Sequence, residues 1–129
     1  MKTKDKPANQ VIRIFTDGSG SRPDGKGSGF AWLREDSGER KVIREDGLTN
    51  NQAEYKAILS ALESIDPHAS VEILTDSENT CFQLKGERRT KDPHLADLSA
   101  RIWAVIKKKS LNTIFTWIPR RENRAGKLI

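Results

Sequence analysis

The sequence contains few of the residues that build disulfides and zinc sites, and it has no long apolar segment. Cys81 is the only cysteine among 129 residues, so neither an internal disulfide nor a thiolate cluster can form. The two histidines, His68 and His94, stand apart and provide no set of zinc ligands. No apolar run approaches the roughly 18–20 residues that a membrane span needs. We therefore expect a protein without membrane partners, located in the reducing cytoplasm.

Basic residues outnumber acidic residues, 23 to 18, which gives a net charge of +5. This charge is compatible with a nucleic-acid partner, but on its own it does not identify one. The basic residues gather in three clusters: Arg88, Arg89 and Lys91; Lys107, Lys108 and Lys109; and Arg120, Arg121 and Arg124. Each cluster is equally compatible with a solvated surface, and the second also with the C-terminal end of a helix, whose dipole favours cations.

The length and the distribution of apolar residues indicate one domain. A chain of 129 residues can enclose one sizeable core, and no linker or repeat divides it. Residues 1–10 are polar and rich in lysine, without the apolar centre of a secretory signal. We predict a flexible N-terminal tail over 1–10 and a folded domain over 11–129.

Short apolar runs alternate with helical stripes along this domain. Strands are expected over 11–16, 30–34, 41–44, 71–75 and 113–118. Helices are expected from Asn50 to Pro67, from Ser77 to Gly86, from Pro93 to about Lys109, and as one or two turns within 122–129. This order predicts an α/β fold with a mixed five-stranded sheet. The first three strands form an antiparallel meander, the later strands are parallel, and helices pack on both faces.

Two predicted strands end in the same pair of residues, Thr16-Asp17 and Thr75-Asp76. If these strands are parallel neighbours, both aspartates lie at the sheet edge where open α/β sheets bind their ligands. Each aspartate alone is also explained as a cap of the following turn or helix. The repetition at equivalent positions favours a shared role.

Glu54 opens the helix that follows the meander and lies on its apolar, core-facing side. A glutamate in a first helical turn is also explained by the helix dipole. On this side, however, Glu54 points to the sheet edge where Asp17 and Asp76 are expected. Three clustered carboxylates repel one another, and a divalent cation compensates that repulsion. Ligand sets made only of oxygen favour Mg²⁺ or Mn²⁺.

Five motifs, in this order, extend the pattern over about Ile12 to Leu128: Thr16-Asp17-Gly18-Ser19, Thr49-Asn50-Asn51-Gln52-Ala53-Glu54, Thr75-Asp76-Ser77, Trp117-Ile118-Pro119-Arg120 and Asn123-Arg124-Ala125-Gly126. Together they resemble the type 1 ribonuclease H family. The resemblance implies a ribonuclease H-like fold and a monomeric endonuclease that hydrolyses the RNA strand of RNA/DNA hybrids. The products carry a 5′-phosphate and a 3′-hydroxyl, and the cofactors are two Mg²⁺ or Mn²⁺ ions.

The resemblance also implies roles for individual residues. Asp17 bridges both ions, while Glu54 and Asp76 hold one. The residues implied in substrate binding are Gly18, Ser19, Asn50 and Asn51 at the 2′-hydroxyl of the RNA strand, Thr49 at a phosphate of the DNA strand, and Glu78, which replaces a glutamine of many members. Ordinary turn and capping chemistry explains the same small and polar residues equally well.

The sequence departs from the family at its end, where no aspartate follows Asp97. The family's fourth aspartate is therefore missing, and we expect the amide oxygen of Asn123 to replace it, in preference to Glu122. A helix cap is the alternative role of Asn123. The histidine that many members have before the last helix is also absent. Two other functions remain open: a non-catalytic module that binds RNA or hybrids with a decayed site, and a metal nuclease acting on DNA.

Overall fold

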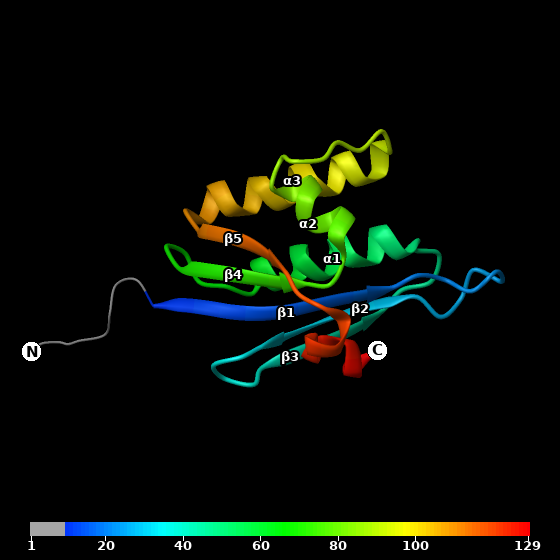
Figure 1. Ribbon diagram of the computed structural model, residues 1–129, viewed down its shortest axis with the longest axis horizontal. Coiled ribbons are helices and arrows are strands. Elements are labelled where there is room, and N and C mark those ends of the chain that lie inside the picture. The colour runs from blue at the N-terminus through cyan, green and yellow to red at the C-terminus, as the bar shows by residue number, and fades with distance from the viewer. Residues whose placement is uncertain (1–9) are drawn as a thin grey trace, which may run out of the picture.

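The computed structural model describes residues 10–129 as a five-stranded sheet with three α-helices and two short 3₁₀ helices (Figure 1). In chain order the elements are β1 (Val11–Ser19), β2 (Gly29–Arg34), β3 (Arg40–Arg44), α1 (Asn50–Glu63), β4 (Ser70–Thr75), α2 (Glu78–Leu84), α3 (Pro93–Lys109), β5 (Asn112–Trp117), η1 (Arg120–Glu122) and η2 (Arg124–Leu128). The predicted tail over 1–10 lies outside the described residues except for Gln10. None of the helices within residues 10–129 has the length and apolar character to span a membrane.

The strand order in the sheet is β3-β2-β1-β4-β5, which confirms the predicted mixed sheet. The meander β1-β2-β3 is antiparallel, and β4 and β5 are added in parallel to β1. Strand β1 continues past the predicted end at Thr16, because residues 17–19 still pair with β2. Asp17 therefore lies inside β1, where it pairs with Ala31 of β2, and not after the end of the strand.

The three α-helices cover one face of the sheet, and the chain end covers the other (Figure 1). The larger core, under the helices, includes Ile14, Ile58, Ile73 and Ile102, each completely buried. The opposite face has a smaller core formed by Phe15, Leu33, Leu74, Ile118 and Ala125. Helices thus lie on both faces, as predicted, but those of the second face are the short 3₁₀ helices η1 and η2.

Local capping fixes the start of α1. The Thr49 hydroxyl accepts a hydrogen bond from the Gln52 amide, and the Gln52 side chain accepts one from the Thr49 amide. This capping box satisfies two amides that the helix leaves unpaired. The helix ends at Glu63, before the predicted stop at Pro67, because Ser64 caps it and donates its hydroxyl to Ala61.

Candidate metal and nucleic-acid site

Three carboxylates converge at the carboxyl end of the two central parallel strands. Thr16 of β1 lies beside Thr75 of β4, so the aspartates that follow, Asp17 and Asp76, lie at the same edge. Glu54 reaches this edge from the first turn of α1. One oxygen from each of the three carboxylates lies within 4.8 Å of the others. The structure therefore brings together all three acids that the sequence pattern singled out.

Glu54 can lie so close to Asp17 because Gly18 has no side chain. A Cβ atom at position 18 would lie 2.3 Å from the carbonyl carbon of Ala53 and 2.5 Å from the amide nitrogen of Glu54. Contacts this short are forbidden to any larger residue. The glycine thus allows the backbone of α1 to rest directly on β1, and this contact delivers Glu54 to the sheet edge.

Burial and mutual repulsion disturb the ionisation of these acids. Glu54 is 9% exposed and Asp17 is 5% exposed. Burial, followed by the charges of Asp17 and Asp76, raises the pKa of Glu54 to about 9. Burial and the charge of Asp76 also raise the pKa of Asp17, although the Gly18 amide donates a hydrogen bond to its Oδ1 at 2.9 Å.

The same carboxylates have hydrogen-bonding capacity that the protein does not use. Within residues 10–129, Glu54 Oε1 and Asp76 Oδ2 are buried and accept no hydrogen bond. Buried oxygens without a partner carry a desolvation cost. A divalent cation would offset both the unused oxygens and the mutual repulsion. The donor set consists of carboxylate oxygens, which suits hard cations such as Mg²⁺ and Mn²⁺.

A hollow of about 420 Å³ opens beside the carboxylates. The residues that line it come from β1, α1, α2, β5 and η1 and from the turn after β4: Gly18, Ser19, Asn50, Asn51, Glu54, Asp76, Ser77, Glu78, Trp117 and Arg120. Five of the six residues expected to bind substrate are among them. The sixth, Thr49, lies just outside as the cap of α1, and its neighbour Asn50 accepts the Gly20 amide at 2.6 Å.

Asn123, the expected fourth ligand, uses both ends of its amide within the fold. Its Nδ2 donates to the Thr16 carbonyl at 2.9 Å, and its Oδ1 accepts the Ala125 amide at 3.1 Å. Asn123 is 4% exposed, and its side chain caps η2. This is the alternative role that the sequence left open. The role of Asn123 as a ligand stays a prediction, and the alternative candidate Glu122 is exposed on η1.

Two residues beside the site belong to the motifs of the family resemblance but were given no role from the sequence. Gly126 lies against Asp17, since a Cβ atom at position 126 would lie 2.9 Å from Asp17 Oδ2. Arg120 lines the hollow, and its charge opposes the rise in the pKa of Asp17. In the sequence Arg120 stood in a basic cluster and at the end of the Trp117-Ile118-Pro119-Arg120 motif, without a role of its own. Its place depends on how the chain returns from β5 towards β1, which no local pattern encodes.

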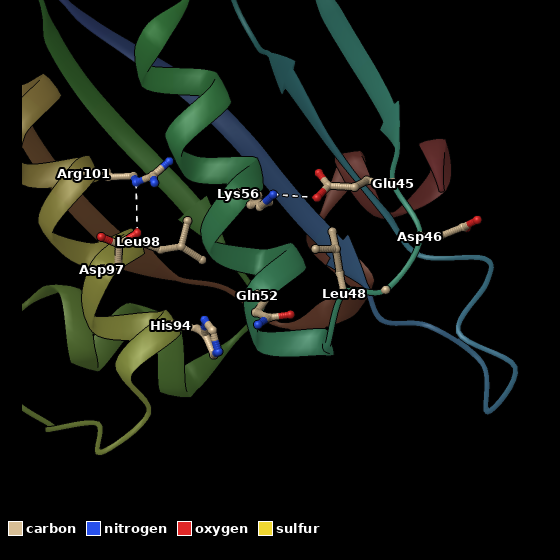
Figure 2. Close-up of a pocket in the computed structure, with 10 residues that line it drawn as sticks. Glu45, Asp46, Leu48, Gln52, Lys56, His94, Asp97, Leu98 and Arg101 are labelled. Atoms are coloured by element: carbon tan, nitrogen blue, oxygen red, sulfur yellow. Dashed lines mark hydrogen bonds and ion pairs between the residues drawn. The ribbon is translucent and has the colours of Figure 1, made fainter.

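A separate hollow of about 340 Å³ lies between the loop before α1 and the helix α3 (Figure 2). Its charged residues are largely neutralised in pairs. Lys56 Nζ lies 2.7 Å from Glu45 Oε2, and Arg101 Nε lies 3.0 Å from Asp97 Oδ2. Figure 2 shows these pairs on opposite sides of the hollow. Such local compensation leaves little net field to attract a charged ligand.

Comparison with known proteins gives one consistent result. Residues 9–122 match the family model of RNase H. A ribonuclease H from Bradyrhizobium sp. (strain ORS 278) is 41% identical over 69 residues, which are 53% of this chain and 45% of that protein. A ribonuclease H from Paramagnetospirillum magneticum is 31% identical over 112 residues, covering 86% of this chain and 68% of the relative. The chain thus spans less than half of the first of these relatives.

Solved structures share the fold over nearly the whole chain. RNase H1 from the halophilic archaeon Halobacterium salinarum NRC-1 superimposes with a TM-score of 0.79 at 28% identity, covering 92% of this chain and 94% of the other. LC11-RNase H1, solved in complex with an RNA/DNA hybrid, gives a TM-score of 0.79 at 31% identity, with 91% and 92% covered.

Proposed function

The chain belongs to the ribonuclease H family, and we propose that it is a metal-dependent endonuclease that hydrolyses the RNA strand of RNA/DNA hybrids. The observation that carries this proposal is the group of three buried carboxylates with oxygens within 4.8 Å of one another. It lies beside a hollow lined by five of the six residues that the family resemblance assigns to substrate binding. The hybrid bound to LC11-RNase H1 supports the same substrate class.

In this proposal Asp17, Glu54 and Asp76 hold the divalent cation. When bound, the cation stabilises charge on the reacting phosphate and favours ionisation of the attacking water. The residues of this chain contribute by holding the carboxylates in position. The Gly18 amide fixes one oxygen of Asp17, and the burial of Asp17 and Glu54 excludes competing water. The carboxylates are therefore arranged before substrate arrives. The expected products are a 5′-phosphate and a 3′-hydroxyl.

The expectation of two ions is the finer part of the proposal. Three carboxylates suffice for one ion, whereas a second ion needs further ligands near Asp17. Asn123 already uses its amide oxygen to accept the Ala125 amide, and Gly126 offers no side chain. We therefore expect a second ion to bind more weakly than the first. Titration calorimetry with Mg²⁺ and Mn²⁺ would resolve two affinities, and a single class of site would limit the mechanism to one ion.

Discrimination of the RNA strand depends on groups that can meet a 2′-hydroxyl, which is both donor and acceptor. Asn50, Asn51, Ser19 and the backbone of Gly18 line the hollow beside the carboxylates. Glu78, at the start of α2, adds a carboxylate that can accept from the 2′-hydroxyl. Thr49 keeps its hydroxyl hydrogen available for a DNA-strand phosphate while its oxygen caps α1. A monomeric state and a cytoplasmic location complete the proposal.

The direct test is cleavage of a labelled RNA/DNA hybrid with Mg²⁺, with Mn²⁺ and with chelator, using duplex DNA and duplex RNA as controls. The matched variant is Asp76→Asn, which keeps the shape of the side chain but removes its charge. We expect metal-dependent cleavage of the RNA strand, reduced more than about 100-fold in the variant, because loss of a direct ligand exceeds the cost of losing a supporting contact. Circular dichroism should show an unchanged fold.

The outcomes separate the rival functions. Preferential cleavage of duplex DNA would replace the proposal by a DNA nuclease. A second candidate, a hybrid-binding module without catalysis, is favoured by one observation: glycine stands beside Asp17 at position 126, where a carboxylate would help to hold metal. Tight hybrid binding without cleavage under any metal would establish that module. An Asp76→Asn variant with full activity would refute the assignment of the site.

A further inference from the structure

A second hollow adjoins the carboxylate site on the other side of Asp17. It measures about 280 Å³, far more than the roughly 30 Å³ that one water occupies in the liquid. Its lining comes from the start of the β1–β2 turn and from the chain end: Asp17, Gly18, Ser19, Arg120, Arg121, Asn123, Gly126, Lys127 and Ile129. Gly18, Ser19 and Arg120 also line the hollow beside the carboxylates, so the two spaces adjoin each other.

The charge of the lining reverses between the two hollows. The first is lined by Glu54, Asp76 and Glu78, with Arg120 as its one basic side chain. The second is lined by Arg120, Arg121 and Lys127, with Asp17 as its one acidic side chain. Asp17 therefore stands at the boundary between an acidic space suited to cations and a basic space suited to anions.

The basic side chains of the second hollow are free to meet a ligand. Arg120, Arg121 and Lys127 are exposed. Among the ion pairs and side-chain hydrogen bonds formed within residues 10–129, none involves these three side chains. This distinguishes the hollow from the one in Figure 2, where Lys56 and Arg101 are paired with acids.

Gly126 adds no charged group to this space. Its backbone lies close to Asp17, since a Cβ atom at position 126 would approach Asp17 Oδ2 to 2.9 Å. Asn123 does not compensate with a free oxygen, because its Oδ1 accepts the Ala125 amide. No carboxylate other than Asp17 lines the hollow through its side chain, and guanidinium groups are the preferred partners of phosphate oxygens.

We propose that this hollow, lined by Arg120, Arg121 and Lys127, binds the phosphate that neighbours the cleaved one in the RNA strand. The inference rests on the proposed function, since it takes the strand at the carboxylates as given. Consecutive phosphates of one strand must occupy adjoining spaces, and the two hollows share Gly18, Ser19 and Arg120. The subsite sets the register of the strand and provides affinity that does not depend on metal.

The test measures hybrid affinity in chelator, where no cleavage occurs. The variant is Arg121→Gln/Lys127→Gln, which leaves Arg120 and the carboxylates intact. The control, Arg101→Gln/Lys108→Gln, removes the same charge from the exposed side of α3. We expect affinity to fall about tenfold in the variant and less than twofold in the control. The slope of log affinity against log salt should decrease by about 0.9 in the variant, as the loss of one phosphate contact predicts.

A substituted substrate localises the effect. A single uncharged methylphosphonate is placed in turn at each RNA position around the cleavage site. The affinity of each hybrid is measured for the parent and for Arg121→Gln/Lys127→Gln, the pocket variant. We expect a methylphosphonate at one position next to the cleaved phosphate to weaken hybrid binding by the parent about tenfold and binding by the variant hardly at all. Such non-additivity is expected when two groups are in contact. Equal losses at every position, or unchanged affinity of the variant, would overturn the subsite.

The two proposals fail in different ways. A parent that cleaves hybrids with metal while the pocket variant binds as well as the parent refutes the subsite alone. A parent that neither binds nor cleaves hybrids refutes the proposed function and the subsite together. Thermal unfolding of the variant within about 2 °C of the parent shows that altered affinity is not caused by unfolding.

Discussion

Glu54 links the site to the stability of the fold. Glu54 is 9% exposed, and one of its carboxyl oxygens is buried with no hydrogen-bond partner within residues 10–129. In the metal-free fold its pKa is about 9, against 4.5 for the free side chain. An acid whose pKa rises on folding favours the folded state fully at low pH. That contribution is lost as pH rises from about 4.5 to about 9.

The variant Glu54→Gln should therefore become more stable relative to the parent as pH rises, in the presence of chelator. Glutamine keeps the shape of the side chain and cannot ionise, so it avoids burying a charge. Urea unfolding of both proteins at pH 5 and pH 8 measures the difference. Magnesium at pH 8 should stabilise the parent and have much less effect on the variant. An equal stability difference at both pH values would contradict the assigned environment.

Gly126 allows a converse test by adding a carboxylate. In Gly126→Asp the new side chain would crowd Asp17 Oδ2, which lies 2.9 Å from the position of its Cβ. In chelator the two charges repel, so we expect a lower melting temperature than that of Gly126→Asn, which has the same shape without charge. Magnesium should reverse the order. If the two variants respond equally to Mg²⁺, position 126 does not face the metal site.

The three carboxylates could be predicted from the sequence because each depends on a local pattern. Asp17 and Asp76 follow apolar strands, and Glu54 lies on the core-facing side of a helix. The role of Asn123 could not be predicted in the same way. A metal ligand and a helix cap require the same residue in the same motif, and only the Ala125 amide, 3.1 Å from Oδ1, shows the capping use.

The site depends most on the contact between the two elements β1 and α1. The backbone of α1 approaches Gly18 so closely that an added Cβ would lie 2.3 Å from Ala53. Backbone atoms cannot move aside as a flexible side chain can. Any side chain at position 18 must push the first turn of α1, with Glu54, away from the sheet.

The variant Gly18→Ala should lower the free energy of unfolding by about 2–3 kcal/mol, the upper range for overpacking. It should also weaken magnesium binding, because Glu54 moves with the helix. Ser19→Ala, one residue further at an exposed position, is the control and should change stability by less than about 0.5 kcal/mol. Guanidinium unfolding and calorimetry measure both effects. Equal free energies of unfolding for the two variants would show that α1 can move away from β1 without loss of stability.

The regular elements agree with their predicted positions to within a few residues, since apolar alternation and helical stripes are local properties. The chain end was less predictable. Residues 120–128 form two 3₁₀ helices because Ala125 packs with Phe15 and Leu33 on the second face of the sheet. That face receives its cover from residues about a hundred positions away in sequence, and no window of neighbours contains this information.

The reactivity of the Cys81 thiol is a measure of global unfolding. It is 0% exposed in the main core, and burial raises the pKa of its thiol. Both effects suppress its reaction with thiol reagents. We expect negligible labelling of the native protein and complete labelling in denaturant, with a urea dependence equal to that of global unfolding. A weaker dependence would mean that α2 opens locally, and rapid labelling in native buffer would contradict the burial.

The hydrogen bond from Asn123 to the Thr16 carbonyl joins residues 107 positions apart. A ribosome adds roughly 5–20 residues per second, so about 5–20 s separate the synthesis of these two partners. During that interval the nascent chain gains Asp17, Glu54 and Asp76, while the turn that packs behind Asp17 does not yet exist. Translation itself therefore delays completion of the carboxylate site. A chain that ended before Asn123 would contain Asp17, Glu54 and Asp76 but would lack the turn that packs behind Asp17.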